Sequence, residues 1–334
     1  MVKAKKFVLE KPFNGFPKAS DLKLVEEELR PIKNGEFLTE AVFLSVDPYM
    51  RSLAHDVAIG QTFIGSQVAK IIESKNPKYP VGKYVVGEFG WRTHTIADET
   101  PPLPKGYPIP WIIPDLEGLP LSLSLVILGM PGNTAYFGFL EICKPQPGET
   151  VVVTGAAGAV GSIVGQIAKI KGCRVIGVAG SDDKGKWLTQ ELKFDHYVNY
   201  KDKDFEKKLA EAAPDGIDCY FDNVGGDLAN KIMRQMNLFG RVSVCGVSSA
   251  YNNKDGAKAD VVQFAVLFKQ LKVEGFIFTR WLDRWFEGVL QNKQWIKEGK
   301  LVYRESVRQG FENMFDVFVE VLKGDNVGKA IVKV

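Results

Sequence analysis

Three glycines placed three residues apart, Gly155, Gly158 and Gly161, give the clearest chemical signal in this chain. They follow a β-branched run at 150–154, which is typical of a buried strand, and precede a run at 162–171 with apolar residues at helical spacing. A turn between a strand and a helix can hold a pyrophosphate, because the amides of the first helical turn and the positive end of the helix dipole face it. The pattern therefore predicts a dinucleotide-binding turn.

Each glycine meets a separate steric demand in such a turn. Gly155 permits the sharp bend, Gly158 lets the backbone approach the phosphates, and Gly161 lets the helix pack closely on the sheet. The predicted cofactor turn comprises Gly155, Ala156, Ala157, Gly158, Ala159, Val160 and Gly161. A structural glycine turn in another α/β unit is the alternative, and a second apolar strand predicted at 174–178 favours the dinucleotide interpretation.

The residues after that second strand bear on which dinucleotide binds. NAD-binding units carry a carboxylate there that accepts hydrogen bonds from the ribose hydroxyls, whereas this chain has Ala-Gly-Ser at 179–181. Ser181 can supply a hydroxyl donor and Lys184 a positive charge to a 2′-phosphate, which favours NADPH. Asp182 and Asp183 weigh against this, and a solvated lysine at the start of a helix is the alternative for Lys184.

The composition excludes several classes of function. The 334 residues include 43 Lys and Arg against 40 Asp and Glu, a net charge of +3 that is too balanced for a nucleic-acid surface. The N-terminal residues contain no long apolar segment, so we expect neither a signal peptide nor a membrane span, and a cytoplasmic location. Four scattered cysteines lack the spacing of a zinc site or a disulfide framework, and we expect them to be buried free thiols. They are Cys143, Cys173, Cys219 and Cys245.

Two kinds of element pattern divide the chain. Short apolar runs at 37–46, 68–72 and 84–86, separated by Gly, Pro and Asn, predict an antiparallel barrel-like domain. A Pro-rich connection at 101–114 follows, and then an apolar segment from Leu121 that we expect to be helical.

The middle of the chain predicts an α/β fold with a doubly wound parallel sheet, because strands alternate there with helical patterns. The predicted strands are 150–154, 174–178, 197–199, 217–221, 240–245 and 272–278. After residue 302 the pattern changes to a strand at 305–307, a helix at 314–322 and a closing strand at 330–334. We expect this tail to return to the first domain.

Five peptides together resemble one known family. They are Val46-Asp47-Pro48-Tyr49-Met50-Arg51, Gly129-Met130-Pro131-Gly132 with Thr134-Ala135-Tyr136, the glycine turn at 155–161, Asp222-Asn223-Val224-Gly225-Gly226, and Gly324-Asp325-Asn326-Val327-Gly328-Lys329. These motifs are similar to those of the prostaglandin reductases, also called leukotriene B4 12-hydroxydehydrogenases or NADP-dependent alkenal double-bond reductases. That family belongs to the zinc-independent branch of the medium-chain dehydrogenases. Plant and bacterial double-bond reductases share most of the motifs.

The resemblance spans almost the whole chain and implies its organisation and activity. It implies a GroES-like, partly open β-barrel catalytic domain at 1–122 and 303–334, and a Rossmann NADPH-binding domain at 123–302. It further implies a homodimer that delivers hydride from NADPH to the β-carbon of small apolar enones and enals, such as 15-oxo-prostaglandins, 2-alkenals and alkenones. NADP-dependent oxidation of leukotriene B4 at its 12-hydroxyl is a weaker implied activity.

The resemblance also implies roles for individual residues. By it, Lys184 holds the 2′-phosphate, Tyr200 lies beside the adenosine half, and Asn326 reaches the nicotinamide end. The remaining implied residues contact the cofactor or border the substrate: Asn223 and Tyr251 follow their strands, Met130 and Thr134 hold the nicotinamide face, and Tyr49 borders the substrate pocket. The asparagines could instead open turns, and Tyr49 and Met130 could be ordinary core residues.

One position departs from the family pattern. Where the family often has a tyrosine near the nicotinamide ribose, this chain has Phe268, which has no hydroxyl to donate. The insertion-like stretch at 253–266 precedes it.

Metal chemistry is not expected. Zinc alcohol dehydrogenases of the superfamily carry Gly-His-Glu where this chain has Gly65-Ser66-Gln67, and three scattered histidines offer no tetrahedral set. Without a Lewis acid, direct alcohol oxidation lacks a means of stabilising the alkoxide, whereas conjugate reduction makes a more modest demand. A quinone reductase of the same superfamily and a non-enzymatic NADPH-binding structural protein are the competing hypotheses.

Overall fold

The computed structural model describes residues 2–100, 110–253 and 261–334, and the chain divides into two compact units. Unit 1 comprises Met1–Val126 and Glu305–Val334, and unit 2 comprises Ile127–Arg304. Most of the Pro-rich connection predicted at 101–114, and part of the insertion-like stretch at 253–266, lie outside the described residues.

Unit 1 is built on a twisted sheet that is antiparallel except for one pair of strands. The strand order is β14-β15-β3-β4-β5-β7, with β6 also paired to β3, and only β14 and β15 run parallel. The strands are β3 (Phe37–Ser45), β4 (Gln67–Ser74), β5 (Tyr84–Gly87), β6 (His94–Ala97), β7 (Trp111–Ile112), β14 (Glu305–Gln309) and β15 (Lys329–Lys333). A separate hairpin of β1 (Lys3–Leu9) and β2 (Leu22–Glu28) completes the partly open barrel.

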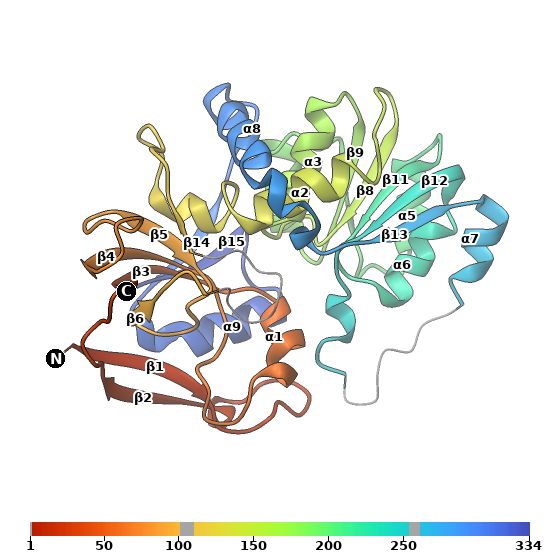
Figure 1. Ribbon diagram of the computed structural model, residues 1–334. Helices are drawn as coiled ribbons and strands as arrows, with labels where there is room; N and C mark the ends of the chain where they lie inside the picture. The colour runs from red at the N-terminus through yellow and green to blue at the C-terminus, as the bar shows by residue number, and fades with distance from the viewer. Residues whose placement is uncertain (1, 101–109, 254–260) are drawn as a thin grey trace. The chain divides into compact units, whose positions relative to one another are not determined.

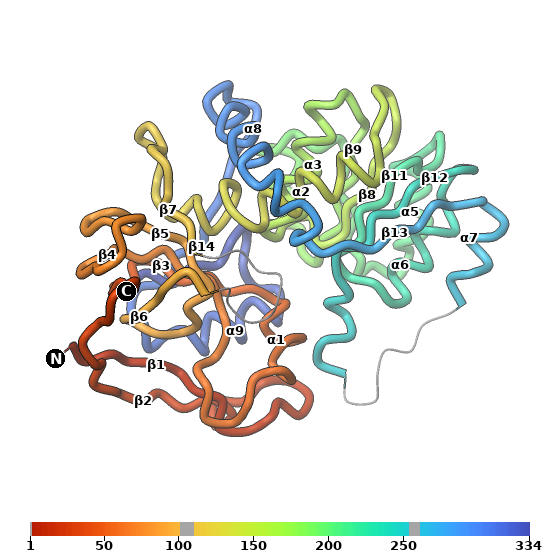
Figure 2. The backbone as a smooth tube through the Cα atoms, in the orientation of Figure 1, coloured from red at the N-terminus to blue at the C-terminus, as the bar shows by residue number. Residues whose placement is uncertain are grey.

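The end of the chain is part of this barrel. The last strand, β15, pairs with β3 through Ile331 opposite Ser45. Figure 2 shows the blue C-terminal segments lying among the red and orange N-terminal strands of unit 1. The described residues of this unit also form two α-helices, α1 (Tyr49–Leu53) and α9 (Met314–Lys323).

An aromatic core joins α9 to the barrel. Phe318 of α9 packs against Phe63 and Trp91, with ring centroids 5.8 and 5.7 Å away, and all three side chains are fully buried. The buried residues of α9, namely Met314, Val317, Phe318 and Val321, recur at helical spacing, so one face of this helix covers the sheet.

Unit 2 contains a six-stranded parallel sheet with the order β10-β9-β8-β11-β12-β13. In Figure 1 the labels β9, β8, β11 and β12 follow one another across this sheet. The strands are β8 (Thr150–Thr154), β9 (Arg174–Ala179), β10 (His196–Asn199), β11 (Ile217–Asp222), β12 (Met236–Val244) and β13 (Lys272–Gly275). This order is that of a Rossmann fold, with β8 as its first strand, and it confirms the predicted doubly wound sheet.

Helices cover both faces of the sheet. The α-helices of unit 2 are α2 (Met130–Leu140), α3 (Gly161–Ile170), α4 (Asp182–Lys186), α5 (Phe205–Ala212), α6 (Gly226–Met233), α7 (Gln263–Lys269) and α8 (Trp285–Lys297). Buried residues of α5, α6 and α7 form one core with Val152, Ile176 and Val242 of the sheet. Shorter helical segments are the 3-10 turns Ala19–Asp21, Ala54–Asp56, Leu121–Leu125, Ser248–Ala250, Phe278–Arg284 and Phe311–Asn313, and a π-helical turn at Trp187–Glu191.

Two strand boundaries were predicted wrongly. The segment from Leu121 is helical, as expected, since Leu121–Leu125 is a 3-10 helix and α2 begins at Met130. Strand β13 ends at Gly275 and not at 278, because Phe276 turns to pack against Gly138. Strand β12 begins at Met236, before the predicted 240, because an irregular register and a positive φ at Phe239 let it pair early with β11.

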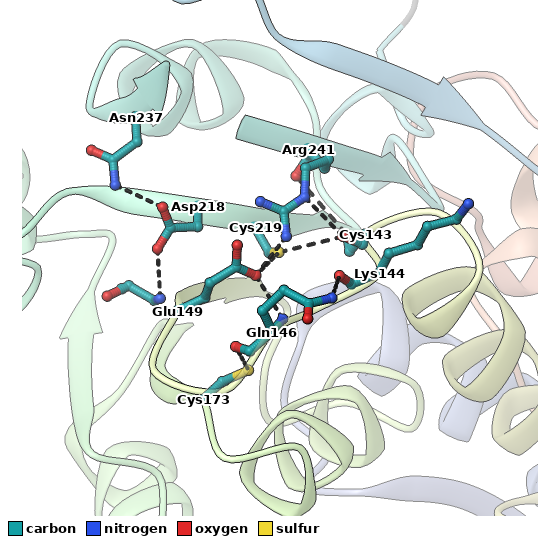
Figure 3. A network of polar contacts seen from close by, with 10 residues as sticks. Cys143, Lys144, Gln146, Glu149, Cys173, Asp218, Cys219, Asn237 and Arg241 are labelled. Carbon is teal, nitrogen blue, oxygen red and sulfur yellow. Dashed lines mark hydrogen bonds and ion pairs between the residues drawn. The ribbon is translucent and has the colours of Figure 1, made fainter. Parts of the chain in front are cut away.

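A polar network holds the amino-terminal edge of the sheet (Figure 3). Arg241 of β12 donates to the Cys143 carbonyl at 2.8 Å and forms an ion pair with Glu149, just before β8. Asp218 of β11 accepts from the amide of Thr150 at 2.9 Å and from the side chain of Asn237 at 2.8 Å. These contacts fix the starts of three strands and leave their carboxyl ends free for a ligand.

The cysteines are free thiols, as expected, but they are not all isolated or fully buried. The Cys219 thiol lies 3.8 Å from the Cys143 carbonyl in the network of Figure 3. Burial raises the pKa of the Cys173 thiol to about 11, which keeps it protonated. Cys245 is half-buried, which corrects the expectation of burial for this residue.

Candidate cofactor site

The glycine turn of unit 2 has the geometry that its spacing predicts. Strand β8 ends at Thr154, Gly155 takes a φ of +60°, and α3 begins at Gly161. The turn closes on itself, because the Gly158 amide donates to the Gly155 carbonyl at 3.0 Å. Within the turn, Ala156 and Ala157 are buried, and residues 158–160 are half-buried.

Backbone contacts require a glycine at position 161 and leave less space than usual for a side chain at position 158. A Cβ atom on Gly161 would lie 2.4 Å from the Gly155 carbonyl oxygen and 2.9 Å from the Ala156 Cα, which a side chain cannot tolerate. A Cβ atom on Gly158 would lie 3.2 Å from the same oxygen. Gly161 therefore allows the helix to start against the strand, and Gly158 keeps the turn open to a ligand.

Backbone donors at the turn suit an anion. The amide N–H groups of Ala159 and Val160 lie in this turn. They immediately precede the ten-residue helix α3, whose dipole favours negative charge at this end. The residues present therefore fit the pyrophosphate of a dinucleotide.

The neighbouring loop after β11 is bonded directly to this turn. The Asn223 side chain donates from Nδ2 to the Thr154 carbonyl at 2.6 Å, and the Asn223 amide donates to Thr154 Oγ1 at 3.0 Å. A Cβ atom on Gly155 would lie 3.3 Å from the Asn223 Cβ. Asn223 is thus held beside the glycine turn, and its predicted contact with the cofactor stays a prediction.

The Asp222 carboxylate fixes the loop after β11 through several hydrogen bonds. One carboxylate oxygen of this buried residue accepts from the Tyr220 hydroxyl at 2.7 Å and from the amides of Val224 and Gly225 at 3.0 and 2.9 Å. Thr154 Oγ1 donates to the same oxygen at 3.2 Å. Asp222 was not among the predicted site residues, although an aspartate before a pair of glycines is a usual turn signal.

The loop after β12 joins the same edge. The Ser249 hydroxyl donates to the Val224 carbonyl at 2.7 Å, and the Ser248 amide donates to the Asn223 carbonyl at 3.3 Å. Tyr251 follows this turn, and burial raises the pKa of its hydroxyl while an interaction with the Val247 backbone opposes the rise. Asn223 and Tyr251 therefore lie on two loops that are hydrogen-bonded to each other.

The loop after β9 contains the residues expected to distinguish the two dinucleotides. Ser181 caps α4 by accepting from the Lys184 amide at 3.5 Å, which leaves the hydroxyl proton available to donate elsewhere. Lys184 is half-buried in the first turn of that helix. Tyr200 covers Gly180, since a Cβ atom there would lie 2.8 Å from the tyrosine ring, and the Tyr200 side chain is 48% exposed.

The two aspartates that weighed against NADPH have partners in the protein. The Tyr197 hydroxyl donates to Asp182 Oδ1 at 3.5 Å, and Lys186 forms an ion pair with Asp183 at 3.2 Å. The Asp183 side chain nevertheless stays 92% exposed, so its pairing with Lys186 offsets only part of the negative charge near Lys184.

Met130 and Thr134 lie one helical turn apart at the start of α2. The Thr134 hydroxyl donates to the Met130 carbonyl at 2.7 Å and lies 3.6 Å from its sulfur. Gly132 packs so tightly that a Cβ atom there would lie 1.9 Å from the Ile127 carbonyl oxygen. This contact fixes where α2 begins and so places Met130 and Thr134.

The remaining two predicted residues, Tyr49 and Asn326, belong to unit 1. Tyr49 opens α1 and packs against the barrel core. Asn326 lies in the loop between α9 and β15, and its side chain donates to the Gly328 carbonyl at 2.8 Å. A buried ion pair between Asp47 and Lys329 joins the two segments that carry them.

Comparison with known proteins places the chain in a family. A model described as the N-terminal domain of oxidoreductase matches residues 5–103, and a zinc-binding dehydrogenase model matches residues 159–294. The chain is 50% identical to prostaglandin reductase 1 of Oryctolagus cuniculus over 333 residues, which is 99% of this chain and 93% of that protein. The chain belongs to the prostaglandin reductase family. This family is part of the zinc-independent medium-chain dehydrogenase/reductase superfamily.

Other members of this superfamily extend the likeness. A 2-alkenal reductase (NADP(+)-dependent) of Nicotiana tabacum is 38% identical, over 100% of this chain and 98% of that protein. The crystal structure of CurA in complex with NADPH from Vibrio vulnificus has a TM-score of 0.91 and 36% identity, over 98% of both chains. The fold, with its GroES-like and Rossmann parts, is the one that the family resemblance implied.

The segment Gly65-Ser66-Gln67, which corresponds to the metal-ligand segment of zinc members of the superfamily, forms hydrogen bonds within the protein. The Gln67 side chain donates to the Gly90 carbonyl at 2.7 Å and to the Arg92 carbonyl at 3.2 Å. The Ser66 hydroxyl donates to the Glu88 carboxylate. Outside 1, 101–109 and 254–260, no three His, Cys, Asp or Glu side chains are placed to hold a metal ion, and no helix is long and apolar enough to span a membrane.

Proposed function

We propose that this protein reduces the α,β carbon–carbon double bond of enones and enals with NADPH. The observation that carries the proposal is a glycine turn that sterically requires Gly161 at the start of a helix, in a chain that is 50% identical over nearly its full length to a prostaglandin reductase 1. NADPH, when bound, supplies the hydride for the β-carbon. The residues of this chain bind the cofactor, orient the substrate and exclude water.

The cofactor would be held along the carboxyl edge of the unit 2 sheet. The amides of 159 and 160 would donate to the pyrophosphate, and Ser181 and Lys184 would hold the 2′-phosphate. Tyr200 would cover the adenosine half, and Asn223 and Tyr251 would border the middle of the cofactor. Met130, Thr134 and Asn326 would contact the nicotinamide end.

The substrate requires little acid–base chemistry from the protein. As hydride adds to the β-carbon, negative charge develops on the carbonyl oxygen of the substrate, and hydrogen bonds to that oxygen stabilise it. A proton from water then adds to the α-carbon, which completes the saturated carbonyl product. Tyr49 is the side chain that we propose borders this oxygen. Replacing Tyr49 by Phe should lower kcat/KM modestly, and an unchanged kcat/KM would remove its hydroxyl from the reaction.

The substrate class is small, apolar and electrophilic. We propose 15-oxo-prostaglandins, 2-alkenals and alkenones, in keeping with the relatives named prostaglandin reductase and 2-alkenal reductase. The four free cysteines and the balanced charge support a cytoplasmic location, where thiols stay reduced.

A homodimer is the proposed assembly. Strand β13 ends the sheet of unit 2, and no other strand within the described ranges pairs with its outer edge. The preceding helix α7 exposes Phe264, Leu267 and Phe268 to 66, 69 and 68%. An open strand edge beside exposed apolar side chains suits a second copy of the chain, which would cover both.

The activity is tested by following NADPH oxidation with purified protein and three acceptors: a 2-alkenal, a 15-oxo-prostaglandin and a quinone. Turnover of the first two with NADPH, and little with NADH, is the expected result. Turnover of the quinone alone would assign the protein to the quinone reductases of the superfamily. Tight NADPH binding without turnover of any acceptor would favour a non-enzymatic role.

A further inference from the structure

A buried ion pair joins two loops of unit 1 that the proposed function needs. Lys329 Nζ lies 2.8 Å from Asp47 Oδ1 and donates to the Val46 carbonyl at 2.8 Å. The two side chains are 1% and 7% exposed. Lys329 is the first residue of β15, three positions after Asn326, and Asp47 lies two positions before Tyr49.

Further hydrogen bonds hold the chain segments that carry Asp47 and Lys329. The Ser45 hydroxyl donates to the second carboxylate oxygen of Asp47. The Met50 amide donates to the Asp47 carbonyl at 3.2 Å, so the first turn of α1 rests on Asp47. On the other side, the Ser306 hydroxyl donates to the Val327 carbonyl at 2.9 Å.

The pair is poorly explained as a source of stability. Removing a lysine and a carboxylate from water carries a large desolvation penalty, and apolar side chains of similar volume often stabilise a protein equally well or better. Backbone pairing between β15 and β3 already joins these segments through Ile331, Val332 and Lys333. A charged pair differs from an apolar contact in demanding one geometry, which suits a positioning role.

Other charged groups face the pair, and they set its electrostatics. Glu305 of β14 lies opposite Lys329 in the sheet register, and burial raises the pKa of its carboxyl. Glu88 carries a carboxyl whose pKa is raised to about 7, first by burial and then by the charge of Asp47. Burial lowers the pKa of Lys329, and Asp47 opposes that change, so the ammonium depends on its partner.

We propose that the Lys329–Asp47 pair is a positioning device, which fixes the loop bearing Asn326 relative to the loop bearing Tyr49. This inference rests on the proposed reductase function, because it assigns both loops to the reacting end of the substrate and cofactor. Neither Lys329 nor Asp47 touches the reacting atoms. They act through the loops that they join.

The test compares three variants with the wild type. Lys329→Met removes the ammonium, Lys329→Arg keeps a cation, and the double variant Lys329→Met with Asp47→Asn also removes the stranded carboxylate. Lys333→Met is the matched control, since Lys333 lies on the same strand but is exposed. Each is assayed for thermal stability, for NADPH affinity by fluorescence, and for kcat and KM with a 2-alkenal well below its melting temperature.

A positioning role predicts a specific pattern. Lys329→Met should lose roughly tenfold to a hundredfold in kcat/KM while remaining folded, because a small misplacement of reacting groups has effects of this size. NADPH affinity should stay near the wild-type value, since the glycine turn belongs to the other unit. The double variant should recover thermal stability but not kcat/KM, and Lys329→Arg should recover part of both. A folded Lys329→Met enzyme with wild-type kcat/KM would overturn the inference.

Hydrogen exchange separates this inference from the proposed function. In Lys329→Met, amide exchange should quicken in peptides covering 46–53 and 324–329 while β4 and β5 keep their protection. Exchange that quickens throughout the barrel, or in neither loop, would contradict the positioning role whether or not an enal is turned over. A wild type that binds NADPH but reduces no enal would instead refute the proposed function.

Discussion

Protonation of the Glu88 carboxyl should change the free energy of unfolding with pH. This carboxyl accepts from the Ser66 hydroxyl beside the buried Asp47, and burial together with the charge of Asp47 raises its pKa from 4.5 to about 7. As pH rises from about 4.5 to about 7, the unfolded chain releases this proton while the folded protein retains it. The free energy of unfolding therefore falls with pH in this window.

The change Glu88→Gln should remove that fall, because a carboxamide keeps an oxygen that accepts from Ser66 but does not titrate. Thermal unfolding measured from pH 5 to 8 should give similar melting temperatures for both proteins at the acid end. At the alkaline end the variant should melt a few degrees higher. A constant difference between the two proteins across this range would show that Glu88 does not titrate there.

Lys184 offers a test of cofactor choice at a single residue. Lys184→Ala should weaken NADPH binding by about tenfold to a hundredfold, the usual range for a lost charge-assisted hydrogen bond, and should leave NADH binding unchanged. Fluorescence titration with both dinucleotides measures the two affinities. Lys186→Ala is the control, because Lys186 lies on the same helix but pairs with Asp183. Equal loss for both dinucleotides would remove Lys184 from phosphate recognition.

At the scale of elements, the strand–turn–helix from β8 to α3 decides whether a dinucleotide can bind. Gly161→Ala would place a methyl group against backbone atoms 2.4 and 2.9 Å away, so the turn must shift. We expect a loss of about 1–3 kcal/mol in the free energy of unfolding, together with loss of NADPH binding. Chemical denaturation and fluorescence titration measure the two effects.

Gly158→Ala separates binding from folding within the same element. Its methyl group would meet only one oxygen at 3.2 Å, so the variant should unfold close to the wild type. It should nevertheless bind NADPH more weakly, because the methyl group takes the space that the phosphates approach. Gly275→Ala in β13, with its nearest atom 4.0 Å away, is the control. Full NADPH affinity in Gly158→Ala would contradict the assigned role of this glycine.

The elements with strong local signals were predictable from the sequence. The β-branched run at 150–154 is the strand β8, and the apolar spacing at 162–171 gives α3 within one residue at each end. The apolar segment from Leu121 was correctly predicted to be helical, but its 3-10 form was not predictable, because the dihedrals of Val126 that end it depend on packing and not on residue type. The early start of β12 likewise depends on pairing with β11, which no local pattern encodes.

The part of the candidate site that lies within one short motif was predictable from the sequence. The glycine turn could be assigned residue by residue, because the clashes that require Gly161 arise within seven consecutive residues. Asp222 was missed because its role is to accept hydrogen bonds from its own loop and from Thr154, which lies 68 positions earlier. Lys329 and Asp47 were quoted only as motif residues, since a pair separated by 282 positions becomes visible only in the fold.

For the whole molecule, the proposed dimer depends on the exposed apolar face of α7. Replacing Leu267 and Phe268 by Lys on α7 should convert a dimer to a monomer, because it places charge on the exposed apolar face. Analytical ultracentrifugation measures the mass, and Val81→Lys, at another exposed apolar position, is the control. A monomeric wild type, or a variant that stays dimeric, would refute this interface.

The proposed reaction delivers hydride to the β-carbon of an enal. It can be followed with NADPH that carries deuterium at the transferred C4 position and a 2-alkenal, with the product analysed by mass spectrometry and NMR. The expected product is a saturated aldehyde with one deuterium at its β-carbon. Deuterium at the former carbonyl carbon of an unsaturated alcohol would contradict it, because that product would arise from reduction of the carbonyl group and not of the double bond.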